Sequence, residues 1–178
     1  LVQRNNLLKQ IRFQNNLIET LEAWDIQLVK YGSEVIKYRE KFIKHLGEVC
    51  QKIHNKLTGG KEKILLEYDR DVGYDSYLTE LAKKRQKDLK YSTTTVGPHR
   101  DDISFIVNGI DIRKYGSQGQ QRTAALSLKL AQIQLMREVM KESPILLLDD
   151  VLSELDSNRK TYLLESIKDT QTIITCTG

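Results

Sequence analysis

The chain holds 178 residues, of which 39% are hydrophobic and 29% charged. This length allows one or two domains with a real core, and this composition is typical of a globular protein rather than a disordered or fibrous one. No apolar run approaches the length of a bilayer span and no signal-peptide pattern occurs, so the sequence predicts no membrane-spanning helix.

Cysteine usage indicates a reducing compartment. Cys50 and Cys176 lie far apart and form no CxxC or zinc-binding pattern. Reduced thiols in a cytoplasmic protein are therefore the simplest interpretation.

Positive charge is concentrated in the first half of the chain. Residues 1–90 hold 18 Lys and Arg against 13 Asp and Glu, whereas residues 91–178 hold 10 against 11. The first half is thus the better candidate to meet a polyanion such as DNA, although so small an excess also fits a solvated helical face. Because Leu1 is not an initiator methionine and Gly178 directly follows an apolar run, we expect a fragment of a longer protein.

Helical periodicity dominates residues 7–57. Apolar residues recur at spacings of three, four and seven, with Asp25 interrupting the stripe, and Gly32–Ser33 is the expected break between two long helices. Trp24 and Tyr31 form a second stripe, which we interpret as helix core rather than a base-stacking platform. These helices should pair into an arm.

A loop, a strand and a basic helix follow. Residues 58–61 resemble a phosphate loop, but the P-loop pattern needs Gly at position 55 and Ser or Thr at position 62. The chain has Asn55 and Glu62 there, so the pattern is not met. Residues 64–68 predict a strand, and Asp75 is the expected cap of the next helix. This helix carries a basic cluster that is either a phosphate-contacting patch or a solubilising face: Lys83, Lys84, Arg85, Lys87 and Lys90.

Residues 97–102 (Gly-Pro-His-Arg-Asp-Asp) contain possible metal ligands, but ligands so close in sequence cannot easily converge on one ion. We interpret the segment as a loop fixed by ion pairing of Arg100. Asn108–Gly109 between two apolar runs then predicts a β-hairpin, because both residues tolerate positive φ.

Residues 117–123 (Ser-Gln-Gly-Gln-Gln-Arg-Thr) open a long helix that runs to about Lys141. Ser117 and Gln120 fit a capping box. A helix start with a glycine and a free hydroxyl is also a good anion site, although capping alone is the simpler explanation of this segment by itself. The broad apolar face predicts that this helix packs against a sheet.

The run at residues 145–150 ends in Asp149 and Asp150. Unbroken aliphatics predict a strand buried on both faces of a parallel sheet, and its carboxyl edge is where such sheets bind ligands. Two adjacent carboxylates there indicate the magnesium ion of a nucleotide, as in a Walker B strand. Because strand neighbours point to opposite sides, one acid can hold the metal while the other activates water. The alternative is a core strand whose acids cap the next helix.

A helix over residues 157–167 and a strand over residues 172–175 complete the chain. Strand, helix and strand with short connections predict a parallel crossover. The fold class is therefore α/β with a helical arm.

Three motifs stand in order: the helix start at Ser117, the strand ending at Asp150, and Ser153-Glu154-Leu155-Asp156. Together they resemble the signature motif, Walker B strand and D-loop of ABC-type ATPases. Residues 97–102, 117–123 and 146–156 resemble most closely the RecF family of SMC-like DNA repair ATPases, over essentially the whole chain. The resemblance implies a basic helical arm, residues 1–90, and part of an ABC-type P-loop ATPase head, residues 91–178.

The resemblance also implies roles for individual residues. Asp149 would support Mg²⁺ and Asp150 would be the catalytic base. The residues that would touch the γ-phosphate of ATP bound by the opposite subunit are Ser117, Gly119 and Gln120, and residues 153–156 would line the dimer seam. RecF-like proteins dimerise on ATP and act at gapped DNA or stalled forks with RecO and RecR to load recombinase.

Two departures limit the resemblance. The Walker A loop and the glutamine loop are missing, so we expect this chain alone to bind ATP poorly and to be inactive. Where transporter-type members place a switch histidine, this chain has Cys176 or Thr177, and Thr175 or Thr177 would sense the γ-phosphate instead.

Two rival functions stay open: an ABC transporter ATPase subunit and a non-catalytic interaction module. The Asp-Asp pair, the missing histidine and the basic arm stand against the transporter. The second rival would make the acids structural.

Overall fold

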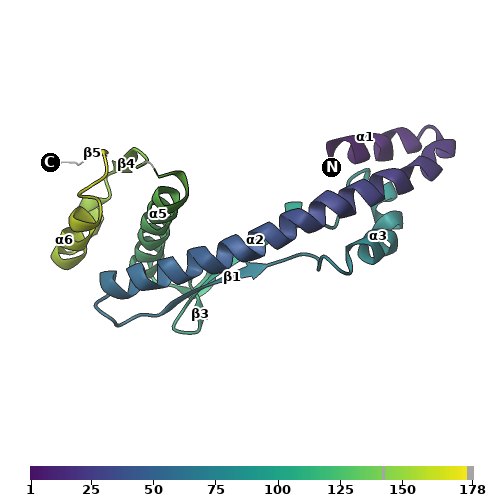
Figure 1. Cartoon of the computed structure of the whole chain (residues 1–178). Helices are drawn as coiled ribbons and strands as arrows, with labels where there is room; N and C mark the ends of the chain where they lie inside the picture. Colours follow the sequence, from purple (N-terminus) through teal and green to yellow (C-terminus); the bar gives the residue numbers. More distant parts are fainter. Residues whose placement is uncertain (142, 176–178) are drawn as a thin grey trace. The chain divides into compact units, whose positions relative to one another are not determined.

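The computed structural model describes residues 1–141 and 143–175 (Figure 1). The helices are α1 (Val2–Ile11), α2 (Leu21–Leu57), α3 (Tyr77–Tyr91), α4 (Ile112–Tyr115), α5 (Gln118–Met140) and α6 (Ser157–Ser166). The strands are β1 (Ile64–Asp69), β2 (Asp102–Val107), β3 (Ile110–Asp111), β4 (Leu146–Asp149) and β5 (Thr172–Thr175). Short 3-10 helices cover Asn15–Thr20, Pro98–Arg100 and Leu152–Glu154. None of the helices described is long and apolar enough to cross a bilayer.

The chain divides into two compact units. Unit 1 comprises residues 1–42 and 68–103, and unit 2 comprises residues 43–67 and 104–178. Each unit combines two separate stretches of sequence, and α2 contributes residues to both. The predicted division into an arm, residues 1–90, and part of an ATPase head, residues 91–178, concerns domains of the family and stays a prediction.

The start of unit 1 has a buried core between α1 and the beginning of α2. Its buried members are Leu7, Leu8, Ile11 and Leu21. Trp24 packs against this cluster, as predicted, but Tyr31 is 60% exposed, so its assignment to the helix core was wrong. Because α1 is only 10 residues long, it covers one short stretch of α2.

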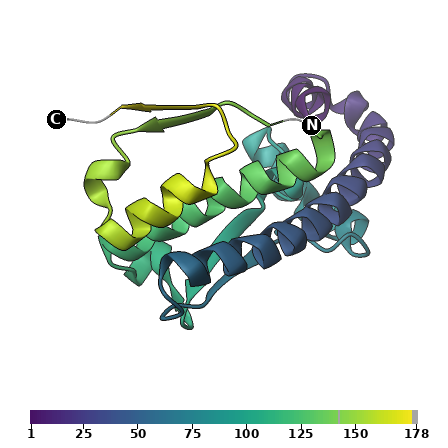
Figure 2. The ribbon, with the colours of Figure 1, turned by 60° about the vertical axis from the view of Figure 1, so that its left-hand side comes forward.

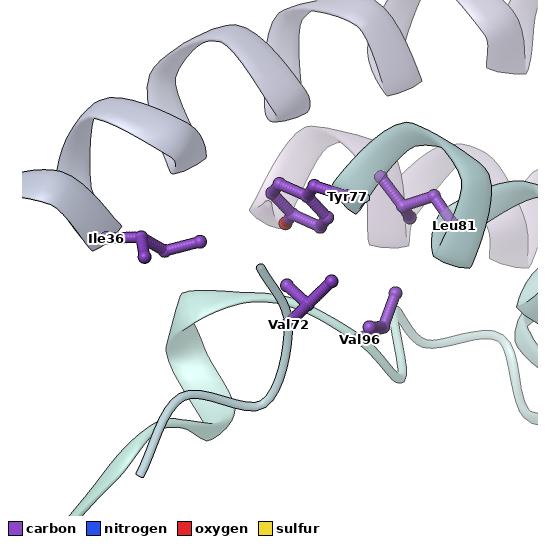
Figure 3. Packing of buried hydrophobic residues seen from close by; sticks show 5 residues of the cluster. All are labelled: Ile36, Val72, Tyr77, Leu81 and Val96. Carbon is purple, nitrogen blue, oxygen red and sulfur yellow. The ribbon is translucent and has the colours of Figure 1, made fainter. Parts of the chain in front are cut away.

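Gly32 does not break the long helix. The sequence predicted a break at this position, but α2, which is 37 residues long, continues through Gly32 without interruption. An added Cβ at Gly32 would lie 2.6 Å from Cε1 of Tyr77, so the glycine makes room for that ring. Tyr77 is fully buried in a cluster with Ile36, Val72, Leu81 and Val96 (Figure 3). Close packing of Tyr77, rather than a helix break, explains the glycine.

A buried ion-pair network explains the acid that interrupts the apolar stripe. Arg4 is 1% exposed; its Nε lies 2.6 Å from Asp25 Oδ1 and its Nη1 lies 2.8 Å from Asp88 Oδ2. Arg4 Nη1 also donates to Thr94 Oγ1 at 2.7 Å. Asp25 is therefore a core residue, because a buried charge needs partners to offset its lost hydration.

The loop at residues 97–102 is fixed by an ion pair, but Arg39 supplies it rather than Arg100. Arg39 Nη1 lies 3.1 Å from Asp101 Oδ2, and the Tyr68 hydroxyl hydrogen-bonds to the same carboxylate. The backbone N–H of Asp71 donates to Asp101 Oδ1 at 3.0 Å. Asp101, which contacts three residues from α2 and from the end of β1 and the turn after it, therefore organises this loop. The prediction of Arg100 as the ion-pairing residue was wrong.

Local turn signals were predictive elsewhere. β2 and β3 pair antiparallel around Asn108–Gly109, whose φ angles are 50° and 84°, so the predicted hairpin is confirmed. The second strand is shorter than expected because Asp111 caps α4, accepting from Arg113 N at 3.0 Å. The helix expected from Asp75 begins at Tyr77, with Ser76 in the cap position.

A parallel strand pair lies in unit 2. β4 pairs with β5 in a register that places Leu146 opposite Thr172 and Asp149 opposite Thr175. Leu146 and Leu148 are buried, but Leu147 is 69% exposed. The predicted burial of β4 on both faces was therefore wrong for this chain. Among the residues that the structure describes, this sheet has two strands, and α5 and α6 lie on one side of them in both views (Figures 1 and 2).

The two helices beside this strand pair run in the direction opposite to the strands. Figure 2 shows α5 and α6 running one way and β4 and β5 the other. The amino ends of the helices and the carboxyl ends of the strands therefore lie toward the same end of unit 2. This is the strand–helix–strand arrangement that the sequence predicted.

Cys50, a free cysteine in this unit, is buried, which raises the pKa of its thiol to about 12.

We predict that Gly32→Ala destabilises the chain, although alanine is the better helix former. The new methyl group would clash with the buried Tyr77 ring, and overpacking of this kind costs about 1–3 kcal/mol. The matched control is Gly47→Ala in the same helix, where the added Cβ would lie 3.5 Å from Leu66 Cβ, an ordinary contact. That variant should gain up to about 1 kcal/mol from helix propensity. Urea unfolding checks both; equal effects would contradict the packing role of Gly32.

Candidate functional site

The carboxyl end of β4 presents an exposed carboxylate. Asp149 is the last residue of the strand, and its Oδ1 accepts a hydrogen bond from the hydroxyl of Thr175 on β5. The register explains the contact, because the two residues lie opposite each other. The result is an acid held in place at the sheet edge where parallel α/β folds bind ligands.

Asp150 leaves the strand in a left-handed conformation. Its φ is 50°, and its N–H donates both to Thr175 O and to Thr175 Oγ1, each at 3.1 Å. Aspartate tolerates this region better than most residues, and such conformations cluster at functional sites. The prediction that strand alternation separates the two acids was wrong in its premise, because β4 ends at Asp149. The turn itself sets the direction of Asp150.

Residues 151–156 connect this edge to α6. Ser153 Oγ donates to Asp150 O at 2.8 Å. Asp156 caps α6, because its Oδ1 accepts from the N–H of Arg159 at 3.0 Å. This N–H holds the pKa of the Asp156 carboxyl below its usual range. Ser153 and Asp156 are both exposed, and each also stabilises the local chain.

The start of α5 carries the predicted capping box. Ser117 Oγ accepts from Gln120 N at 3.2 Å, and Gln120 Oε1 accepts from Ser117 N at 3.1 Å. Gly119 is exposed, and its carbonyl accepts from Thr123 Oγ1 at 2.7 Å. A capping box uses the N–H groups of the cap and third helical positions and leaves those between for another acceptor. The helix start is thus capped, and it leaves backbone N–H groups of the kind that bind anions at helix starts.

Two residues that support this helix start through side-chain contacts, Glu62 and His54, were not predicted from the sequence. Gln120 Nε2 donates to Glu62 Oε1 at 3.2 Å, and Glu62 Oε2 lies 3.1 Å from His54 Nε2. In the sequence, Glu62 is notable only as a departure from the P-loop pattern, and nothing local to His54 indicates its partners. Contacts across 58 residues of sequence leave no spacing signal.

The basic helix α3 belongs to unit 1. Lys84 and Lys87 are exposed, and Lys83 pairs at 2.7 Å with an acid one turn earlier in the helix. Arg85 Nη2 lies 2.8 Å from Asp25 Oδ2, so this charge is engaged with a buried acid. The assignment of these residues to DNA stays a prediction. Lys84 and Lys87 are its best candidates.

The predicted switch position is described only in part. Thr175 Oγ1 hydrogen-bonds to Asp149 and accepts from Asp150 N, so Thr175 joins the two acids. Cys176 and Thr177, the other candidates, lie outside the described residues.

Comparison with known proteins gives a consistent result. No protein-family model matches the chain. It is 58% identical over 178 residues to the DNA replication and repair protein RecF of Agathobacter rectalis, and 56% identical over 178 residues to that of Lachnospira eligens. These alignments cover 100% and 99% of this chain but 49% of each relative. The chain therefore spans about half the length of the curated relatives it matches.

Solved structures agree with the sequence comparison. A structure of the recombination mediator protein RecF-ATP in the RecFOR pathway matches with a TM-score of 0.88 at 38% identity. The match covers 100% of this chain and 50% of that chain. The predicted fold class, an ABC-type α/β ATPase fold with a helical arm, is confirmed by this match.

We predict that Asp156 contributes to the pH dependence of stability. Because the folded-state pKa is depressed, its contribution is present above the unfolded pKa of about 3.9 and is lost as the pH falls through the folded value. Asp156→Asn keeps a capping side chain but does not titrate. Its stability should therefore fall less than that of the parent between about pH 6 and about pH 2, measured by urea unfolding. Identical pH profiles would contradict this role.

Proposed function

We propose that this chain, which matches RecF over its whole length, is a fragment of a RecF-like DNA repair ATPase and supplies two halves of a composite nucleotide site. One half is the carboxyl end of β4 with Asp149 and Asp150, and the other is the start of α5 at Ser117. The observation that carries the proposal is the exposed Asp149 carboxylate, fixed by Thr175 at the end of a parallel strand pair. A similar solved protein is described as RecF-ATP, which supports ATP as the ligand.

The donor set fits Mg²⁺. Magnesium prefers oxygen ligands, keeps several waters and is commonly held by one or two carboxylates together with nucleotide phosphates. Asp149 offers an exposed carboxylate and Thr175 a hydroxyl beside it. When bound, the ion would neutralise charge on the phosphate oxygens. Asp149 would hold it through direct or water-mediated contact.

Asp150 is the proposed general base. A base must lie close to the attacking water but need not bind the metal, and the turn at Asp150 removes this residue from the strand. Ser117, Gly119 and Gln120 would contact the γ-phosphate of ATP held by a second protomer. Residues Ser153 and Asp156 would line the seam, and Thr175 would respond to the γ-phosphate. ATP then favours the dimer because only the dimer completes the site, and hydrolysis ends the association.

DNA is the proposed partner of the arm. Exposed lysines on α3 can neutralise phosphates without reading base sequence, which suits a protein that recognises gapped DNA by its form. A similar solved protein is described as a recombination mediator in the RecFOR pathway. We therefore propose that the complete protein acts in the cytoplasm with RecO and RecR to load recombinase at gaps or stalled forks.

The rival functions are weaker. The relatives compared above are named as DNA replication and repair proteins, which disfavours a transporter subunit. A non-catalytic interaction module would leave Asp150 without a chemical role, and the first of the following experiments decides that point.

In the complete protein, Asp150→Asn should abolish turnover and preserve ATP-dependent dimerisation. Loss of a general base typically lowers the rate by about 100-fold to 10,000-fold, whereas the amide keeps the size of the side chain. Steady-state ATPase assays measure turnover, and analytical ultracentrifugation with ATP measures dimerisation. The matched control is Asp169→Asn, an exposed acid between α6 and β5, which should behave as the parent. Full turnover by the Asp150 variant would contradict the assignment, as would a monomer in the presence of ATP.

Replacement of Lys84 and Lys87 with alanine should weaken DNA binding and reduce its salt dependence. Each lost phosphate contact lowers the slope of log K against log salt by about 0.9 on duplex DNA, so the pair should lower it by about 1.8. Fluorescence anisotropy at several salt concentrations measures the slope. The matched control replaces Lys41 and Lys44, two exposed lysines of α2, with alanine and so removes the same amount of charge from another helix. An equal change of slope in both double variants would exclude a specific role for α3.

A further inference from the structure

A chain of side-chain contacts leads from a buried histidine to the start of α5. His54 is fully buried, and its Nε2 lies 3.1 Å from Glu62 Oε2. Glu62 Oε1 accepts from Gln120 Nε2 at 3.2 Å, and Gln120 Oε1 accepts from Ser117 N at 3.1 Å. All of these residues belong to unit 2.

The histidine is anchored at its second nitrogen. Ser127 Oγ lies 2.9 Å from His54 Nδ1 and 2.7 Å from Thr123 O, and its single hydroxyl hydrogen serves one of them. Burial lowers the pKa of His54, although the hydrogen bond that His54 donates to Glu62 acts in the opposite sense, and the charge of Arg159 adds to the lowering. A neutral imidazole has one N–H group, and a carboxylate partner requires that this hydrogen sits on Nε2. The ring therefore holds Glu62 in one orientation.

Glu62 in turn decides which way the Gln120 amide faces. A glutamine side chain has an NH₂ donor on one side and a carbonyl acceptor on the other, and the two can exchange by rotation. Because Glu62 offers only acceptor atoms, it selects the NH₂ group, and the carbonyl must then face the N–H of Ser117. If the amide rotated, its NH₂ group would face another donor and half of the capping box would be lost.

The segment that carries Glu62 is itself held in place by hydrogen bonds. Thr58 Oγ1 donates to His54 O at 2.8 Å at the end of α2, and the backbone N–H of Lys63 donates to Asn108 Oδ1 at 2.9 Å. The loop between α2 and β1 is thus fixed on both sides of Glu62. A carboxylate held in this way can position Gln120 without rearrangement when ligand arrives.

We propose that His54 and Glu62 are positioning residues for the phosphate-binding start of α5: they fix the Gln120 amide, and through it the Ser117 backbone, in the orientation that accepts a γ-phosphate from a second protomer. This inference rests on the proposed function. It assigns to the end of α2 the task of keeping the helix start preformed. Binding costs less when the contacting groups are already ordered, so loss of this support should weaken dimerisation rather than nucleotide binding by the monomer.

The test is Glu62→Gln in the complete protein. The new side chain keeps its size but has a donating NH₂ group in place of one carboxylate oxygen, so it no longer offers one acceptor oxygen to His54 and another to Gln120. Loss of a hydrogen bond to a charged acceptor should weaken ATP-dependent dimerisation about 10-fold or more, measured by analytical ultracentrifugation across protein concentrations. ATP affinity of the monomer and the unfolding midpoint should change little. Hydrogen exchange at the Ser117 amide should accelerate, because its acceptor is no longer fixed. Glu67→Gln, an exposed acid on β1, is the matched control.

Ser117→Arg separates the possible failures, because it should block dimerisation and spare ATP binding by the monomer. If Ser117→Arg blocks dimerisation while Glu62→Gln dimerises as the parent does, only this inference is overturned. An equal loss of dimerisation, monomer ATP binding and stability in the Glu62 variant would also overturn it, since that pattern reports a general structural role. If Ser117→Arg dimerises normally with ATP, the proposed function itself is wrong.

Discussion

The arrangement of the two acids depends on the parallel pairing of β4 with β5. This register sets Asp149 opposite Thr175, so that one hydroxyl hydrogen-bonds to the carboxylate of Asp149 and to the N–H of Asp150. A shift of one residue would turn the strand over and remove Asp149 from its partner. Between the two strands lies α6, which Asp156 caps, and its amino end lies toward the same end of unit 2 as the carboxyl ends of the strands (Figure 2). The acids, the connecting residues and the final strand therefore form one local arrangement.

Features encoded by neighbouring residues were predicted well from the sequence. The hairpin at Asn108–Gly109 follows from two residues that tolerate positive φ, and the capping box follows from Ser117 and Gln120 three positions apart. The strand Leu146–Asp149 follows from its aliphatic run, although the predicted strand extended to Asp150. In each case the signal and the structure that it produces lie within a few residues, so that no knowledge of the fold is needed.

Features that depend on distant partners were not predictable. Gly32 resembles a helix break until Tyr77 is placed against it, and Asp25 resembles a surface acid until Arg4 is placed beside it. The support of Gln120 by Glu62 also spans a long stretch of sequence. The conformation of Asp150 belongs to the same class, because the contacts with Thr175 that accompany its left-handed turn come from the next strand. Tertiary contact, which has no fixed spacing, decides each of these positions.

In the proposed nucleotide site, the acids after β4 and the helix start at Ser117 belong to two halves that meet only between protomers. A crystal structure of the complete protein with a non-hydrolysable ATP analogue tests it most directly. We expect a dimer in which Asp149 lies at the magnesium ion of one nucleotide and Ser117 of the other protomer contacts the γ-phosphate of that same nucleotide. A structure in which every contact to the nucleotide comes from a single protomer, with Ser117 facing solvent, would contradict the claim.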